Sequence, residues 1–134
     1  MKILTTILLL TVAFSVQASP LEKNMKTIDK NMKSISKQIG KADKKEDSLK
    51  RIDTILEAAK AAQEETPKTI QKMPTEKQPE ATEKYKDYLQ KLDEKMNQLK
   101  VAINDNNAEQ SKSILKEIDQ LKKDGHKDFK KKKK

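Results

Sequence analysis

The chain has 134 residues, a formal net charge of +9 and no cysteine. The lack of cysteine excludes disulfides, thiol chemistry and the covalent attachment of a c-type haem. Only two glycines and few aromatic residues are present, whereas lysine and glutamate are abundant. This composition, together with the helical spacing of the apolar residues described below, predicts an all-α protein.

The first residues have the pattern of an export signal. Lys2 is followed by residues 3–16, which are almost all apolar or hydroxylic, and by Val16-Gln17-Ala18, which offers small residues for cleavage. We expect residues 1–18 to be a signal peptide that is cleaved after about Ala18. The apolar run is shorter than the ~20 residues of a membrane span, although an uncleaved N-terminal anchor is the alternative. With no second apolar run and no cysteine to carry a lipid, residues 19–134 are expected to form a single periplasmic domain with no integral membrane segment.

The first half of the mature chain predicts two amphipathic helices. Residues 21–39 carry an apolar seam with alternating steps of three and four, and Gly40 provides a stop signal. Residues 44–65 carry a second apolar seam, and we expect Pro67 to end this second helix. Asp43 and Glu46 have the spacing of a capping box at its start. The two seams consist of Leu21, Met25, Ile28, Met32, Ile35 and Ile39, and of Leu49, Ile52, Leu56 and Ala59, with Ile55 beside the latter.

The second half predicts two further helices after a long connection. Residues 66–78 contain Pro67 and Pro74, and we expect this connection to cover part of the core. A third helix is predicted from Pro79 to residue 103, and a fourth from the turn at residues 104–107 to about residue 129, with Asn106 and Glu109 spaced as a capping pair. Four such helices with short first and third connections predict an antiparallel up-down-up-down four-helix bundle.

The lysine run at residues 130–134 has two interpretations. It is either a solvated tail or a segment that is attracted to an acidic partner or an anionic membrane surface. We do not expect nucleic acid as a partner, because the chain has no aromatic stacking platform.

Met25 and His126 form a candidate pair of metal ligands. In the predicted topology the start of the first helix and the end of the fourth lie at the same end, and both residues sit about one turn from it. A thioether and an imidazole that face each other can bind one metal axially, as Met/His pairs do for haem in electron-transfer proteins. Alternatively, Met25 is core filler and His126 is solvated or interacts with the helix dipole. Gly125 could end the helix at Asp124, whereas Phe129 argues for its continuation.

Several segments resemble the cytochrome b562 family. Residues 21–28, Leu-Glu-Lys-Asn-Met-Lys-Thr-Ile, are similar to the start of the mature family members, in which the methionine is a haem ligand. Residues 62–67, Ala-Gln-Glu-Glu-Thr-Pro, resemble the end of the second helix, and Pro79-Glu80 resembles the opening of the third. Lys100-Val101-Ala102 precedes an Asn-rich turn, as in the family. Alignment without gaps from Ala108 places His126 on the histidine ligand.

The resemblance implies one non-covalent haem b per chain, with Met25 and His126 as its metal ligands. It also implies that Ile28, Pro67, Tyr85 and Leu89 line the haem pocket, with Lys122 and Lys130 near the haem rim. Family members commonly have two phenylalanines where Tyr85 and Leu89 stand here. Gly125 replaces a bulky residue.

We therefore expect a periplasmic electron-transfer protein that is a monomer and has a redox partner of acidic surface charge. The alternative is a haem-free helical bundle that acts as a binding or stress-related, chaperone-like protein. We do not expect an enzyme, because the chain has no inward pair of carboxylates, no Glu-x-x-His motif and no nucleophile with an adjacent base.

Overall fold

The computed structural model describes residues 20–129, and every regular element in this range is a helix. The predicted signal peptide (1–18) and lysine tail (130–134) lie outside the described residues. Four long helices carry the fold: α2 (Pro20–Gln38), α3 (Lys45–Ala62), α5 (Gln78–Asn104) and α6 (Ala108–Phe129). Three short helices connect them: η2 (Ala42–Lys44), α4 (Lys68–Gln71) and η3 (Thr75–Lys77).

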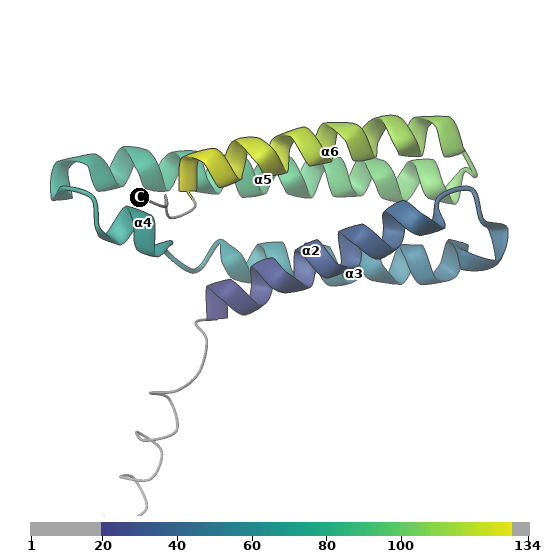
Figure 1. Ribbon diagram of the computed structural model, residues 1–134, viewed down its shortest axis with the longest axis horizontal. Coiled ribbons are helices and arrows are strands. Elements are labelled where there is room, and N and C mark those ends of the chain that lie inside the picture. The colour runs from purple at the N-terminus through teal and green to yellow at the C-terminus, as the bar shows by residue number, and fades with distance from the viewer. Residues whose placement is uncertain (1–19, 130–134) are drawn as a thin grey trace, which may run out of the picture.

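The connections alternate between the two ends of the molecule (Figure 1). α2 turns into α3 at one end, α3 reaches α5 through α4 at the other end, and α5 turns into α6 at the first end. α2 packs on α3, α3 on α5, and α5 on α6. The start of α2 and the end of α6 therefore lie at the end that carries α4, as the positions of Met25 and His126 require if they are to share a site.

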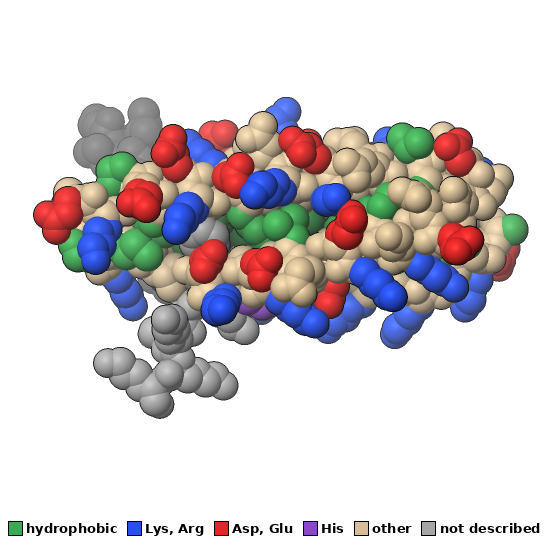
Figure 2. Space-filling model, turned by 90° about the horizontal axis from the view of Figure 1, so that it is seen from above, with side chains coloured by type: hydrophobic (Ala, Val, Ile, Leu, Met, Phe, Trp, Pro, Cys, Tyr) green, Lys and Arg blue, Asp and Glu red, His purple; other side chains and the backbone are tan. Residues whose placement is uncertain are grey.

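The core follows the predicted seams. Ile35 of α2, Ile52 of α3 and Leu99 of α5 are completely buried. On α3, Ile55 is completely buried, whereas Leu56 is only partly buried, so the buried face is rotated slightly from the predicted seam. Lysine, arginine and carboxylate side chains are scattered over the face seen in Figure 2, with apolar side chains visible between them. Burial of this shared seam stabilises helices whose exposed faces are highly charged.

The turns confirm one predicted signal and correct two others. α2 ends before Gly40, whose φ of 85° lies in the left-handed region, as expected of a glycine stop. The predicted capping box of Asp43 and Glu46 is wrong, because η2 contains Asp43 and α3 begins only at Lys45, without a side-chain cap. The cap of α6 is Asn107 rather than Asn106: the Asn107 Oδ1 accepts a hydrogen bond of 3.0 Å from the Gln110 N–H. Asn106 instead adopts a φ of 59°, which asparagine tolerates better than most residues.

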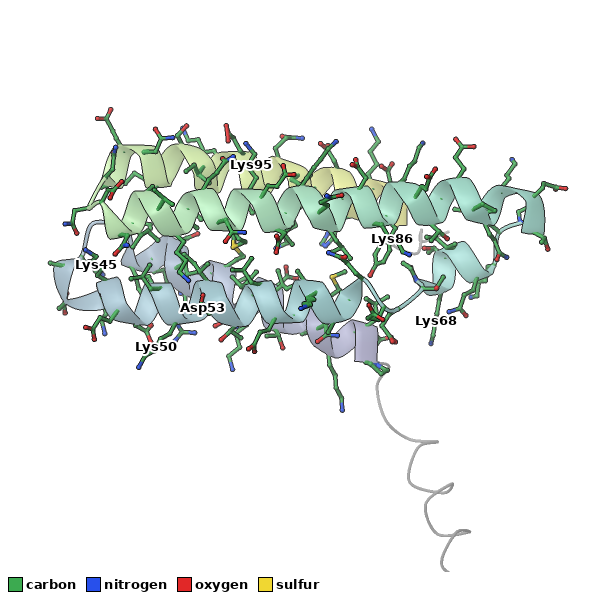
Figure 3. The ribbon with its side chains drawn as sticks, turned by 180° about the vertical axis from the view of Figure 1, so that it is seen from behind. Lys45, Lys50, Asp53, Lys68, Lys86 and Lys95 are labelled. Carbon is green, nitrogen blue, oxygen red and sulfur yellow. The ribbon has the colours of Figure 1, made fainter. Side chains whose placement is uncertain are left out.

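Hydrogen bonds and ion pairs connect the long helices to one another. The α2–α3 pair shares a network in which Gln38 donates to Asp47 at 2.7 Å and accepts from the buried Ser48 hydroxyl at 2.7 Å. The hydrogen bond from Gln38, followed by that from Arg51, lowers the pKa of Asp47. Two ion pairs join the other helices, Lys95 to Glu117 of α6 at 2.7 Å and Lys100 to Asp53 of α3 at 2.8 Å. Lys95 and Asp53 are labelled in Figure 3.

The substitution Leu99→Ala tests the position of the core. Leu99 is 0% exposed, and its truncation is expected to lower the free energy of unfolding by about 2–5 kcal/mol because it leaves a cavity. Val101, two residues further along α5, is 60% exposed, and Val101→Ala should change that free energy by no more than ~0.5 kcal/mol. Urea unfolding of the haem-free protein, followed by circular dichroism, measures both. Equal effects of the two substitutions would contradict the assigned core.

Candidate functional site

A cavity of about 680 Å³ opens between α2, α4, α5 and α6 at the end of the molecule that carries α4. Its volume is within the ~300–1,000 Å³ of typical ligand sites. Most of the wall is apolar, and charged side chains from α2, α4 and α6 complete it. The apolar lining consists of Leu21, Met25, Ile28, Met32, Pro67, Tyr85, Tyr88, Leu92, Ile118 and Gly125.

Met25 and His126 both line this cavity, the first from α2 and the second from α6. Met25 is partly buried and His126 is exposed. No group within residues 20–129 forms a hydrogen bond or ion pair with the His126 ring, so protein partners there do not occupy its nitrogens. The fold thus brings to one cavity two residues that lie 101 positions apart in the sequence (126 − 25).

Gly125 does not end α6, which continues to Phe129. Gly125 is instead buried against the Tyr88 ring of α5. A Cβ atom at position 125 would lie 2.5 Å from the Tyr88 Cε1 and 2.6 Å from its Cζ, which is closer than real contacts allow. Glycine therefore permits the backbone of α6 to lie directly on the aromatic ring. Of the two alternatives that the sequence left open at Gly125, the continuation favoured by Phe129 is the one observed. Tyr88 was not among the predicted site residues, although it lies three residues after Tyr85 and can share its helix face.

Tyr85 joins the end of α3 to α5. Its hydroxyl donates a hydrogen bond of 2.8 Å to the carbonyl of Ala62, the last residue of α3. Carbonyls at a helix C-terminus lack partners within the helix, so this bond helps to satisfy one of them. Burial, and then the nearby carboxylate of Glu65, raises the pKa of Tyr85. For Tyr88, burial followed by the charge of Asp29 raises the pKa to about 12.

The structure places the other predicted site residues as follows. Ile28, Pro67, Tyr85 and Lys122 line the cavity, whereas Leu89 is completely buried in the core and does not line it. On α5 the residues that face the cavity are instead Tyr85, Tyr88 and Leu92, at spacings of three and four. Lys130 lies outside the described residues. The seam pattern alone cannot separate core from cavity wall, because both are apolar.

Lys122 has a specific partner in the cavity wall. Its Nζ lies 2.9 Å from the Oδ1 of Asp29, and this ion pair connects α6 to α2 beside the cavity. Both side chains are partly exposed, so the pair contributes at most ~1 kcal/mol to stability. Its structural role is to link two helices that flank the cavity.

A helical protein with a large apolar cavity between its helices belongs to the class that holds a ligand or cofactor inside a bundle. A comparison with family models identifies the family: residues 20–130 match the model described as Cytochrome b562. The chain belongs to the cytochrome b562 family, as the resemblance predicted. Neither the curated proteins nor the solved structures contain a significant match to this chain.

Membership of the family has three direct consequences. It implies a haem cofactor and electron transfer rather than enzymatic catalysis, and the family is periplasmic. Among the helices of residues 20–129, none has the length and apolar character needed to cross a membrane. The apolar wall, thioether and imidazole of the cavity suit haem, which needs an apolar slot and axial ligands.

The contact between Gly125 and Tyr88 predicts that the effect of Gly125→Ala on the free energy of unfolding changes sign when Tyr88 is also replaced. Gly125→Ala should destabilise the protein by about 1–3 kcal/mol, because the new Cβ overlaps the Tyr88 ring. In a Tyr88→Ala background the ring is gone, and the same change should stabilise α6 by up to ~1 kcal/mol because alanine favours helix over glycine. Urea unfolding of the four proteins measures the cycle. The same sign in both backgrounds would disprove the proposed contact.

The raised pKa of Tyr88 predicts a loss of stability in alkali. The phenol has its ordinary pKa of 10.0 in the unfolded chain, but a pKa of about 12 in the folded protein. The unfolded state therefore releases its proton first, and the free energy of unfolding should fall as the pH rises from 10 to about 12. Tyr88→Phe should make this fall shallower. Urea unfolding across this pH range provides the measurement, with phenolate absorbance as an independent record of ionisation.

Proposed function

We propose that this protein is a periplasmic electron carrier that binds one non-covalent haem b, with Met25 and His126 as the axial ligands of the iron. The observation that carries the proposal is that a thioether from α2 and the chain's sole imidazole, from α6, line one large apolar cavity. The family match supports the cofactor. The absence of cysteine requires that haem be held without covalent attachment.

The fold that we propose for this function is the antiparallel up-down-up-down four-helix bundle. The alternation of the connections between the two ends supports it. In this arrangement α2 and α6 both contribute side chains to the same cavity. Haem iron, when bound, supplies reversible one-electron chemistry. The protein's part is to fix the two ligands, exclude water with Ile28, Leu92 and Ile118, and hold the macrocycle in a low-dielectric site.

The proposed ligation also explains why the protein would carry electrons rather than catalyse a reaction. A haem with Met25 and His126 on its two axial positions has no open position at which a substrate could bind. Methionine as the sixth ligand raises the reduction potential relative to other axial ligands. The positive charge of the chain further supports a redox partner with an acidic surface, and we propose that the carrier itself is monomeric.

Substitution of the two ligands tests the proposal. Haem-free wild-type protein titrated with ferric haem should give a sharp Soret band, and a low-spin spectrum with split visible bands on reduction. His126→Ala should weaken haem affinity by at least about 10-fold, since even outer partners of metal ligands contribute that much. Met25→Leu should convert the iron to a high-spin form and change the reduction potential.

Met32 provides the matched control for Met25. It lies on the same helix, lines the same cavity and carries the same thioether. Met32→Leu should leave the low-spin spectrum intact if Met25 is the ligand. If neither His126→Ala nor Met25→Leu altered the spectrum or the affinity, or if the wild-type protein bound no haem, the haem-free binding or chaperone-like bundle would be the better interpretation.

A further inference from the structure

Four lysines line the cavity, and three of them form no ion pair within residues 20–129. Lys26, Lys68, Lys72 and Lys122 all line it, but only Lys122 has an ion-pair partner within residues 20–129. The other three residues are exposed, so each of them both lines the cavity and is accessible to solvent. The carboxylates in the wall are Glu22 and Asp29, and Asp29 is already paired with Lys122. The edge of the cavity therefore has an excess of positive charge.

The short helix α4 holds two of these lysines in place. Ile70 of α4 is 0% exposed and anchors the helix to the core. The Gln71 side chain donates a hydrogen bond of 2.8 Å to the Thr66 carbonyl. The Gln78 side chain donates one of 2.9 Å to the Met73 carbonyl, which ties the segment after α4 to the start of α5. Figure 3 shows α4, with Lys68, beside α5 and at the opposite end from Lys45. The long connection is thus an ordered part of the cavity wall.

Lys68 and Lys72 lie on the same side of this anchored segment. They are four residues apart, and the Lys72 N–H bonds to the Lys68 carbonyl at 3.0 Å, which continues the helical turn. Residues four apart on a helix share a face, and both side chains line the cavity. Lys26 adds a third cation from α2. A ligand that suits this site has an apolar body and carries its negative charge at one edge.

We propose that Lys68 of α4 and Lys72, the residue directly after α4, together with Lys26 of α2, bind the propionate carboxylates of haem and make the cavity selective for a carboxylated porphyrin over an uncharged one. This inference rests on the proposed haem binding and adds to it a second group of binding residues. Because the lysines are exposed, each pair with a carboxylate is worth only as much as a surface ion pair. Loss of both Lys68 and Lys72 should therefore reduce haem affinity by about 2- to 30-fold.

The test compares two porphyrins and three proteins. Haem-free wild-type protein, Lys68→Gln/Lys72→Gln and Lys33→Gln/Lys37→Gln are each titrated with ferric haem and with its dimethyl ester, which lacks the carboxylate charges. Lys33 and Lys37 are the matched control, because they are also exposed, four residues apart and without an ion pair within residues 20–129, but lie outside the cavity wall. Both double variants remove the same charge. Circular dichroism checks that all three proteins are folded.

The α4 variant should lose affinity for haem by about 2- to 30-fold while its affinity for the diester stays unchanged. The control variant should show a much smaller loss, and the difference between haem and diester should shrink at high salt. Equal losses for both porphyrins, or an equal loss in the control variant, would refute the role of α4 and leave the proposed function standing. A wild-type protein that bound neither porphyrin would refute both.

Discussion

The ring of Tyr88 lies where a side chain at position 125 would be, and this contact determines how α6 meets α5 beside the cavity. A larger residue at position 125 would push the two helices apart or displace the ring. A shift of α6 would move His126, which is the next residue on that helix, and displacement of the ring would change the cavity wall that Tyr88 lines. One close contact, between the Tyr88 ring and the α6 backbone at Gly125, therefore influences the cavity wall, the approach of the His126 imidazole and the burial of Tyr88.

The way in which the helices pair separates the packed core from the cavity. Strong packing joins α2 to α3 and α5 to α6, and the contact of α3 with α5 connects the two pairs. α2 and α6 are joined beside the cavity by the ion pair of Asp29 and Lys122. A bundle arranged in this way can keep a rigid core around Leu99 and Ile52 while leaving space for a flat cofactor between its first and last helices.

Charge and apolar surface are separated within the site, which suits an amphipathic cofactor. The inner wall offers Ile28, Leu92 and Ile118, and the edge carries Lys26, Lys68 and Lys72. Tyr85 is buried and Tyr88 is partly buried in this wall, and burial is the main cause of the raised pKa of both. A low-dielectric wall favours a non-covalent macrocycle and influences the potential of its iron.

The sequence by itself determined the helical class and the approximate bounds of the four long helices, and it singled out Met25 and His126 as a candidate pair, because 3.6-residue periodicity is a local property of the chain. It also suggested the family, through short motifs near those residues. Only the tertiary structure decided that Leu89 belongs to the core while Tyr88 and Leu92 face the cavity, since both environments are apolar and differ by a small rotation of α5. The same holds for Gly125. Along the chain it could either end the helix or lie within it, but the ring of Tyr88, 37 residues earlier (125 − 88), makes it a site of close packing inside a continuous helix.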